Sequence, residues 1–176
     1  NSDKGVYYSK IQDAIDDASP GDTIFVYGGV YYENIEINKG INLIGKHATI
    51  DGGGAGNVVM ITADNVNISG FTIRNGGFGA YAGIKIESSY NTIYNCTIIN
   101  NDHGIILMWA YHNTISDCNI SSNNWGIYAW HSYNNTIYNN YFNNDVNAYD
   151  NGYNRWNISK TYGRNIIGGD YLGGNY

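Results

Sequence analysis

The same three-residue motif returns at a fixed interval in the second half of this chain. Asn-Thr-Ile begins at Asn91, Asn113 and Asn135, so successive copies lie 22 residues apart. The residues around each motif align with little adjustment. A fixed period of this length is typical of a solenoid, in which each repeat forms one coil that stacks on the next.

Hydrophobic residues alternate within each repeat, which is the periodicity of a β-strand and not of a helix. Ile105 and Leu107 share one face of the first strand, and two further short strands follow in the same coil. Three short strands per coil of about 22 residues predict an all-β fold, a right-handed parallel β-helix. Equivalent residues should stack about 4.8 Å apart. Ile93, Ile115 and Ile137 should therefore form one interior column.

The N-terminal part predicts a short capping helix. Ser9 is its expected N-cap, and Gln12, three residues later, completes a capping box. Such a helix would cover the open end of the solenoid, where exposed strand edges invite aggregation. No comparable helix is expected at the other end. We assign residues 9–19 to the cap helix, 22–144 to β-helix coils and 145–176 to an irregular C-terminal segment, all within a single domain of residues 1–176.

Asparagine is unusually frequent, with 28 residues in the chain. It tolerates the left-handed conformation that sharp corners require. Its amide can also pair with the amide one coil above, which satisfies buried polar groups along the stack. We expect these roles for the asparagine pairs at 100–101, 123–124 and 143–144.

Composition excludes two classes of protein. The net charge is −6 and only 14% of residues are charged, so the basic face of a nucleic-acid-binding protein is missing. No run of 18 apolar residues is present, so no membrane-spanning helix is predicted. The first residues show no signal-peptide pattern, which leaves a cytosolic protein or one whose signal has been removed.

Two stretches resemble known families. Residues 7–45, YYSKIQDAIDDASPGDTIFVYGGVYYENIEINKGINLIG, are similar to the start of NosD-like β-helix domains of the carbohydrate-binding-and-sugar-hydrolase type. Residues 156–176, WNISKTYGRNIIGGDYLGGNY, are similar to the end of β-helix domains in archaeal cell-surface, surface-layer and sheath proteins. The resemblance implies a β-helix over nearly the whole chain and an extracellular or cell-envelope location, with the signal peptide removed.

The repeats contain few residues that could form a catalytic site. Glycosidases of this fold need two or three carboxylates on one face. Here the candidates Glu87, Asp102, Asp117 and Asp145 do not align in one column. No catalytic residues and no cofactor are therefore expected.

Metal binding is also not expected. Met108, His112 and His131 lie on neighbouring coils, and NosD-like relatives act in copper-enzyme maturation. Their spacing is nevertheless not a recognised set of ligands. Surface histidines are the simpler interpretation.

Two other sets of residues are candidates for modification. Cys96 and Cys118 occupy the same inward position of successive coils, either as buried free thiols or, with local distortion, as a disulfide. Five Asn-X-Ser/Thr motifs are candidate glycosylation sites in a secreted protein. They begin at Asn67, Asn95, Asn119, Asn134 and Asn157.

Aromatic and apolar residues are predicted to gather outside the coils, as candidates for an interface or for stacking on glycans. Exposed patches of this kind mark interaction sites. Tyrosine and tryptophan offer contact area at a low entropy cost. The residues are Ile106, Met108, Trp109, Tyr111, Tyr128, Trp130, Tyr133 and Tyr138.

Two functions remain open. The chain could be a non-catalytic structural subunit whose aromatic faces and uncapped C-terminal end pack against copies of itself in an extracellular sheath, surface layer or fibre. Alternatively, the aromatic strip could bind cell-surface polysaccharide, as a carbohydrate-binding module or a lyase- or hydrolase-type domain. The missing carboxylate set and the family resemblance favour the structural subunit.

Overall fold

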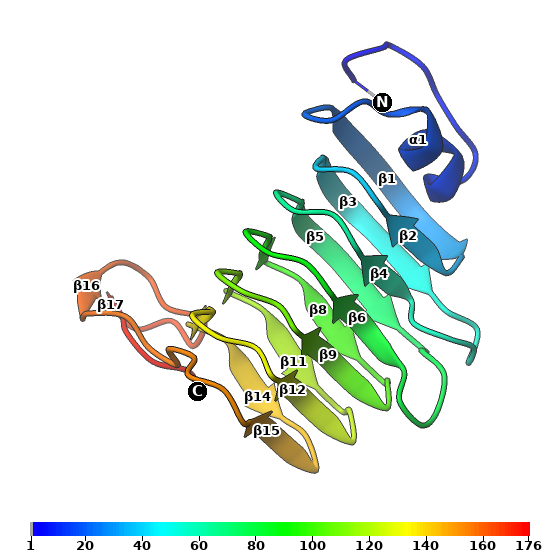
Figure 1. The fold of residues 1–176 in the computed structure, drawn as a ribbon. Coiled ribbons are helices and arrows are strands. Elements are labelled where there is room, and N and C mark those ends of the chain that lie inside the picture. Colours follow the sequence, from blue (N-terminus) through cyan, green and yellow to red (C-terminus); the bar gives the residue numbers. More distant parts are fainter. Residues whose placement is uncertain (1) are drawn as a thin grey trace.

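The computed structural model describes residues 2–176 and contains one helix and seventeen strands within them. Figure 1 shows a stack of parallel coils with helix α1 (Ile11–Asp17) at the N-terminal end and an irregular tail at the other. The predicted all-β parallel β-helix with a short helix is confirmed.

Two parallel sheets form the walls of the solenoid. The six-stranded sheet contains β2 (Ile35–Ile37), β4 (Val59–Ile61), β6 (Ala82–Ile86), β9 (His103–Met108), β12 (Trp125–Trp130) and β15 (Val146–Asp150). The nine-stranded sheet contains β1 (Thr23–Tyr32), β3 (Asn42–Asp51), β5 (Asn67–Arg74), β7 (Thr92–Tyr94), β8 (Thr97–Ile99), β10 (Thr114–Ser116), β11 (Asn119–Ser121), β13 (Thr136–Tyr138) and β14 (Tyr141–Asn143). The tail adds a small antiparallel pair, β16 (Thr161–Tyr162) and β17 (Tyr171–Leu172).

The interior is built from columns of identical residues. Ile68, Ile93, Ile115 and Ile137 pair in register from one coil to the next, and all four are fully buried. The 22-residue period therefore places the same side chain at the same interior position in each coil, as predicted.

Asparagine ladders satisfy the polar groups at the corners of this interior. The backbone N–H of Asn91 donates to Asn113 Oδ1 at 2.8 Å, and the Asn113 N–H donates to Asn135 Oδ1 at 2.8 Å. Because all three residues are buried, each bond replaces one that water would otherwise make. One asparagine of each predicted pair belongs to a second ladder of this kind: Asn101, Asn123 and Asn144.

Sharp corners repeat with the same period. Asn95, Asp117 and Asn139 all have positive φ, between 51° and 57°. The chain turns there between the two short strands of each coil. Asparagine and aspartate suit these positions because they tolerate the left-handed region.

The cap helix begins later than predicted, and its N-terminus is satisfied by a distant residue. The N-cap is Lys10, which makes no side-chain capping bond, and not Ser9. The N–H groups of Ile11 and Gln12 donate instead to the two carboxylate oxygens of Glu33, at 2.9 and 3.0 Å. The predicted capping box is therefore wrong. A carboxylate from the first coil takes the place of the local serine.

The C-terminal segment is more ordered than predicted. Residues 146–150 form β15, a sixth strand beside β12. Farther along the tail, the Ile137 N–H donates to Arg155 O and the Phe142 N–H donates to Tyr176 O. The tail thus covers the outer edges of β13 and β14. Only β15 fits the expectation of an uncapped C-terminal end.

No helix in residues 2–176 has the length and hydrophobicity needed to cross a bilayer.

Candidate functional site

Aromatic rings meet on the outer side of the last coils. Tyr128 on β12 stacks on Tyr149 of β15 with ring centroids 4.8 Å apart, and Trp130 lies parallel to both rings at 6.2 and 6.3 Å. Trp125 meets Tyr128 and Tyr149 edge to face. His103 on β9 stacks on Trp125 at 6.1 Å. We call these five residues the aromatic face.

A second group of rings lies on the turns that follow β9 and β12. Trp109 stacks on His131 at 4.6 Å, and Tyr111 stacks on Tyr133 at 5.9 Å. Each pair joins residues 22 positions apart in the sequence. We call these four residues, together with the stacked pair Tyr90 and His112 at 5.1 Å, the aromatic corner.

Stacking between successive coils decides which part of each ring is free. The repeat places one ring directly above another, so ring faces turn toward the neighbouring coil. Each stacked pair covers one side of its two rings, and Trp109 and Tyr90 still remain 58% exposed. Rings ordered in this way can contact another protein or stack on a sugar.

Four residues of the aromatic corner lie in the left-handed backbone region. Tyr90, Trp109, His112 and His131 have φ between 46° and 59°. Histidine tolerates this region, but it is an outlier for a side chain as bulky as tyrosine or tryptophan, and elsewhere in the chain asparagine usually fills it. Tyr90 and Trp109 are therefore held in place at a local conformational cost.

The structure brings most of the predicted interface residues together, but not all of them. Trp109 is exposed, whereas Met108, Tyr111, Tyr128, Trp130 and Tyr133 are half-buried at the face or the corner. Ile106 is only 3% exposed, so its prediction as an interface residue is not supported. It lies between Lys85 and Tyr128 in adjacent strands, whose longer side chains flank it. Tyr138 lies on β13, in the other sheet.

Three residues of the aromatic face were missed by sequence reasoning. His103 and Trp125 open β9 and β12 one coil apart, and that shared position was the available signal. Tyr149 was missed because the offset between coils falls from 22 to 21 residues at β15, where Trp125 pairs with Val146. The alternating stretch VNAYD carried the signal for this strand.

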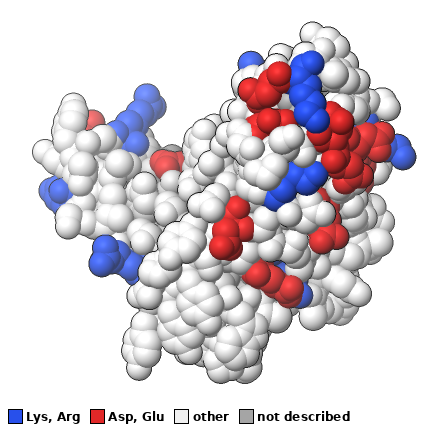
Figure 2. Space-filling view, turned by 45° about the horizontal axis from the view of Figure 1, so that its top comes forward, with Lys and Arg blue, Asp and Glu red and all other residues white. Residues whose placement is uncertain are grey.

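Charge is nearly absent from these coils. Residues 104–144 contain a single Asp, Glu, Lys or Arg side chain, Asp117. Figure 2 shows charged side chains gathered over the N-terminal end of the molecule and, at the left, on the C-terminal tail, while a broad part between them is free of charge. A surface with few charges and many aromatic groups loses little on desolvation.

The carboxylates near the coils are engaged in local contacts. Glu87 pairs with Lys85 at 2.7 Å. Asp102 accepts a hydrogen bond from Asn124 Nδ2 at 2.6 Å and lies 3.2 Å from His103 Nδ1. The latter contact has the distance of an ion pair without hydrogen-bond alignment, since His103 Nδ1 lacks a hydrogen-bond partner. The geometry therefore does not point to a particular acid–base pair.

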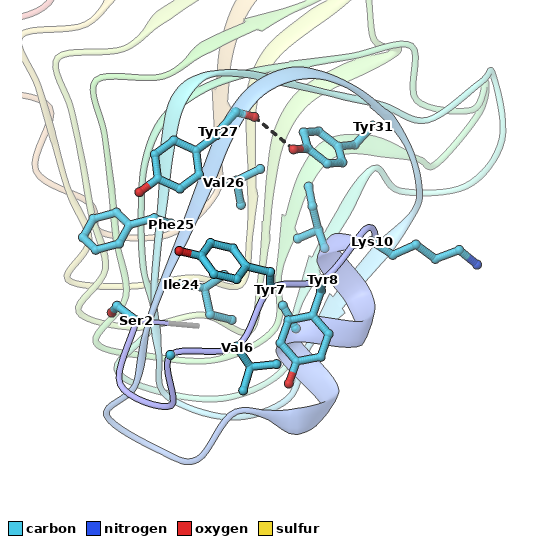
Figure 3. A pocket seen from close by; sticks show the side chains of 13 residues that line it. Ser2, Val6, Tyr7, Tyr8, Lys10, Ile24, Phe25, Val26, Tyr27 and Tyr31 are labelled. Atoms are coloured by element: carbon cyan, nitrogen blue, oxygen red, sulfur yellow. Dashed lines mark hydrogen bonds between the residues drawn. The ribbon is translucent and has the colours of Figure 1, made fainter.

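A separate pocket lies at the N-terminal end, between the first residues, helix α1 and β1. Its volume is about 350 Å³. Figure 3 shows the rings of Tyr7, Tyr8 and Tyr27 around it and the Lys10 side chain extending away. A hydrogen bond to Asp17, with a smaller effect of burial, raises the pKa of Tyr8. Phenol groups over an apolar floor can hold a small, partly polar ring.

The candidate modification sites differ in accessibility. Cys96 and Cys118 are free and buried, and burial raises the pKa of the Cys118 thiol. Three glycosylation candidates are exposed, namely Asn95, Asn134 and Asn157. The other two, Asn67 and Asn119, are half-buried on β5 and β11.

Comparisons with known proteins agree on the fold and point to a family. The model of the NosD family, described as periplasmic copper-binding protein, matches residues 4–176. A cell surface glycoprotein of Methanothermus fervidus is 34% identical over 111 residues, which are 60% of this chain; the match spans 17% of that protein's length. A pectin methylesterase from Aspergillus niger has a similar fold, with a TM-score of 0.57 and 19% identity over 84% of this chain and 55% of its own.

The family description names copper, but the side chains present do not form a site for it. No cluster of three or more His, Cys, Asp or Glu suited to a metal occurs in residues 2–176. His112 stacks on Tyr90, and His131 stacks on Trp109. These imidazoles serve as members of aromatic pairs.

The family assignment rests on coverage. The match runs over almost the whole chain, and the solenoid has the repeated coils that the sequence resemblance implied. The likeness to pectin methylesterase, at 19% identity, concerns the fold alone. This chain belongs to the NosD family.

Proposed function

We propose that this protein is a non-catalytic structural module of an extracellular cell envelope, which assembles with copies of itself into a sheath, surface layer or fibre. The observation that carries the proposal is the aromatic, nearly uncharged surface of the last coils. Two comparisons support the location: the similar Methanothermus fervidus protein is a cell surface glycoprotein, and the family description is periplasmic.

The geometry of this surface favours association with protein. Its rings already pack against each other, so little side-chain entropy remains to be lost when a partner binds. The strained backbone at Trp109 and Tyr90 keeps large rings where asparagine would be easier to accommodate. Both residues are 58% exposed and so remain available for contact.

Assembly of the purified chain tests this proposal. Light scattering and negative-stain imaging should reveal large particles that form without added glycan. Trp109→Asp should weaken assembly, because it places a charge in the contact surface. Aspartate tolerates the left-handed backbone at this position, so the fold should survive.

Tyr7→Asp is the matched control, since Tyr7 is 92% exposed at the opposite end of the solenoid. This variant should assemble like the unmodified protein. A chain that stays monomeric at millimolar concentration would rule out the structural role.

Carbohydrate binding is the second candidate, and the N-terminal pocket is the observation that favours it. Tyr7 and Tyr27 are 92% and 57% exposed at its opening, where a sugar could contact both a ring and a hydroxyl. Calorimetric titration with polysaccharide fragments should then give binding that Tyr27→Ala abolishes and Trp109→Asp preserves. Absence of binding to a broad glycan panel would rule out carbohydrate binding. Release of sugar products would instead show that the protein is an enzyme.

A further inference from the structure

Side chains protect part of the sheet edges at the N-terminal end of the solenoid. The amide of Gln12 accepts from the Glu36 N–H at 2.8 Å and donates to the Glu36 carbonyl at 3.2 Å, which covers the edge of β2. Ser2 and Asp3 bond to the backbone of Thr23 on β1. An uncovered strand edge is a template for pairing with another chain. Here the edge of β2 and the first residue of β1 are covered.

The tail closes the end of one sheet at the opposite end of the molecule. The Asn139 N–H donates to Gly174 O at 2.8 Å, and the Phe142 N–H donates to Tyr176 O at 2.7 Å. The side chain of Asn175 accepts from Asn140 at 3.0 Å and continues an interior ladder. Thus β13 and β14 present no open edge to a partner.

Strand β15 has a bare edge at the C-terminal end. It is the terminal strand of the six-stranded sheet and pairs only with β12 among the strands of residues 2–176. Its first four residues are exposed. Ala148 continues the column of Ile84, Ile105 and Ile127, which are fully buried. Figure 1 shows no other ribbon beyond β15 at this end of the stack.

We propose that β15 pairs antiparallel with β15 of a second copy, around a two-fold axis that passes beside Ala148. This inference rests on the proposed self-assembly and names the surface that carries it. A bare strand edge needs a strand as its partner, and a second copy supplies one of equal length. Pairing about the midpoint of Val146–Asp150 matches all five residues of both strands.

The hydrogen-bonding pattern of β15 is compatible with this axis. On the β12 side, the Asn151 N–H, just past the strand, donates to Ala129 O at 3.2 Å, and the carbonyl oxygen of Asn147 lies against Gly126. Because the direction of the backbone groups alternates along a strand, those of Tyr149 also point to β12, and those of Ala148 and Asp150 point to the free edge. Ala148 would therefore face its own counterpart in a hydrogen-bonded pair on the axis, with Cα atoms about 5.5 Å apart.

The side chains of β15 support the same arrangement. Alanine is small enough for the close approach on the axis. Tyr149 already stacks on Tyr128, so pairing would extend the aromatic face across both copies. The Asp150 carboxylate accepts from Trp156 Nε1 at 2.9 Å and from Asn154 Nδ2 at 2.7 Å, which satisfies it within its own chain.

A cysteine placed on the axis tests the register. Under mild oxidation, Ala148→Cys should form a disulfide-linked dimer, because a Cα separation of about 5.5 Å lies within the range of disulfides. The native Cys96 and Cys118 are buried and should not compete. Val30→Cys, exposed on β1, is the matched control and should stay uncrosslinked.

A second variant tests the contribution of the edge to assembly. Ala148→Lys should raise the dissociation constant of the assembly at least tenfold, whereas Val30→Lys should leave it unchanged. Thermal melting of dilute samples verifies that both variants fold. If the unmodified chain assembles but Ala148→Cys does not crosslink and Ala148→Lys has no effect, the edge proposal is wrong and the structural function stands. If the unmodified chain never assembles, both proposals are wrong.

Discussion

At the scale of single residues, this fold depends on buried amides. Asn113 is 1% exposed. It accepts from the Asn91 N–H at 2.8 Å and donates to Asn135 Oδ1 at 2.9 Å and to Ser88 O at 3.1 Å. A buried polar group that loses its partner costs about 1–3 kcal/mol. The ladders are therefore a requirement of the 22-residue coil rather than a by-product of composition.

Removal of one ladder amide should strongly destabilise the protein. Asn113→Ala leaves the Asn91 N–H and the Ser88 carbonyl without this partner, and we expect it to lower the free energy of unfolding by about 3 kcal/mol. Urea denaturation measures the change. Asn143→Ala, at an exposed residue of β14, should stay within about 0.5 kcal/mol. Equal losses in the two variants would contradict the role of the ladder.

The contacts of the Asp51 carboxylate predict that the stability of the protein falls in acid. Burial alone would raise the pKa of this carboxyl, but hydrogen bonds from the Gly53 N–H, Asn75 and Arg74 outweigh burial and lower the pKa. The stability that follows is present above the unfolded pKa of about 3.9 and is lost as pH falls through the lower folded pKa. Denaturation of Asp51→Asn should show a deficit at pH 6 that shrinks toward pH 2. A deficit independent of pH would refute this account.

At the scale of elements, helix α1 depends on a coil that follows it. The helix has seven residues, too few to be stable alone. Ile11, Ala14 and Ile15 bury its apolar side, and Glu33 satisfies two of its first N–H groups. The cap is thus formed jointly by the helix and by the chain at the end of β1.

Because the cap depends on Glu33 and not on Ser9, substitutions at these two residues should differ in their effect on stability. Glu33→Ala should destabilise the protein by about 1–2 kcal/mol, through loss of two hydrogen bonds to a charged group at a helix N-terminus. Ser9→Ala should change stability by less than about 0.5 kcal/mol. Thermal unfolding followed by circular dichroism compares them. A larger loss of stability in Ser9→Ala than in Glu33→Ala would show that Ser9 caps the helix after all.

At the scale of the whole molecule, the two ends differ in how they are closed. The N-terminal end has a helix and side-chain caps. The C-terminal end has a tail that covers one sheet and leaves β15 open. Aromatic rings lie near the open edge, and most acidic side chains lie near the other end, so the two ends of the solenoid also differ in surface chemistry.

Attachment of the tail should depend on Asn175. Its side chain accepts two bonds from Asn140 and donates to Ile137 O and Trp156 O. Asn175→Ala should therefore speed proteolytic cleavage within residues 157–174 severalfold while the coils stay resistant. Asn157→Ala, at an exposed residue, is the control. Unchanged cleavage in Asn175→Ala would mean that the tail is held by other contacts.

Sequence periodicity alone determined the coils. A repeat of 22 residues forces each side chain to meet its own equivalent in the next coil, so Ile93, Ile115 and Ile137 could be placed in one column in advance. The same logic indicated the asparagine ladders and an outer surface rich in aromatic residues. These features depend only on spacing and residue type.

Only the tertiary structure decided features that depend on neighbours outside the period. Glu33 caps α1 from 22 residues away, and the tail returns to cover the last coil. The shortened offset at β15 brings Tyr149 onto Tyr128. Each outcome follows from how the backbone closes in space at the ends and corners, where a repeating pattern no longer specifies which groups meet.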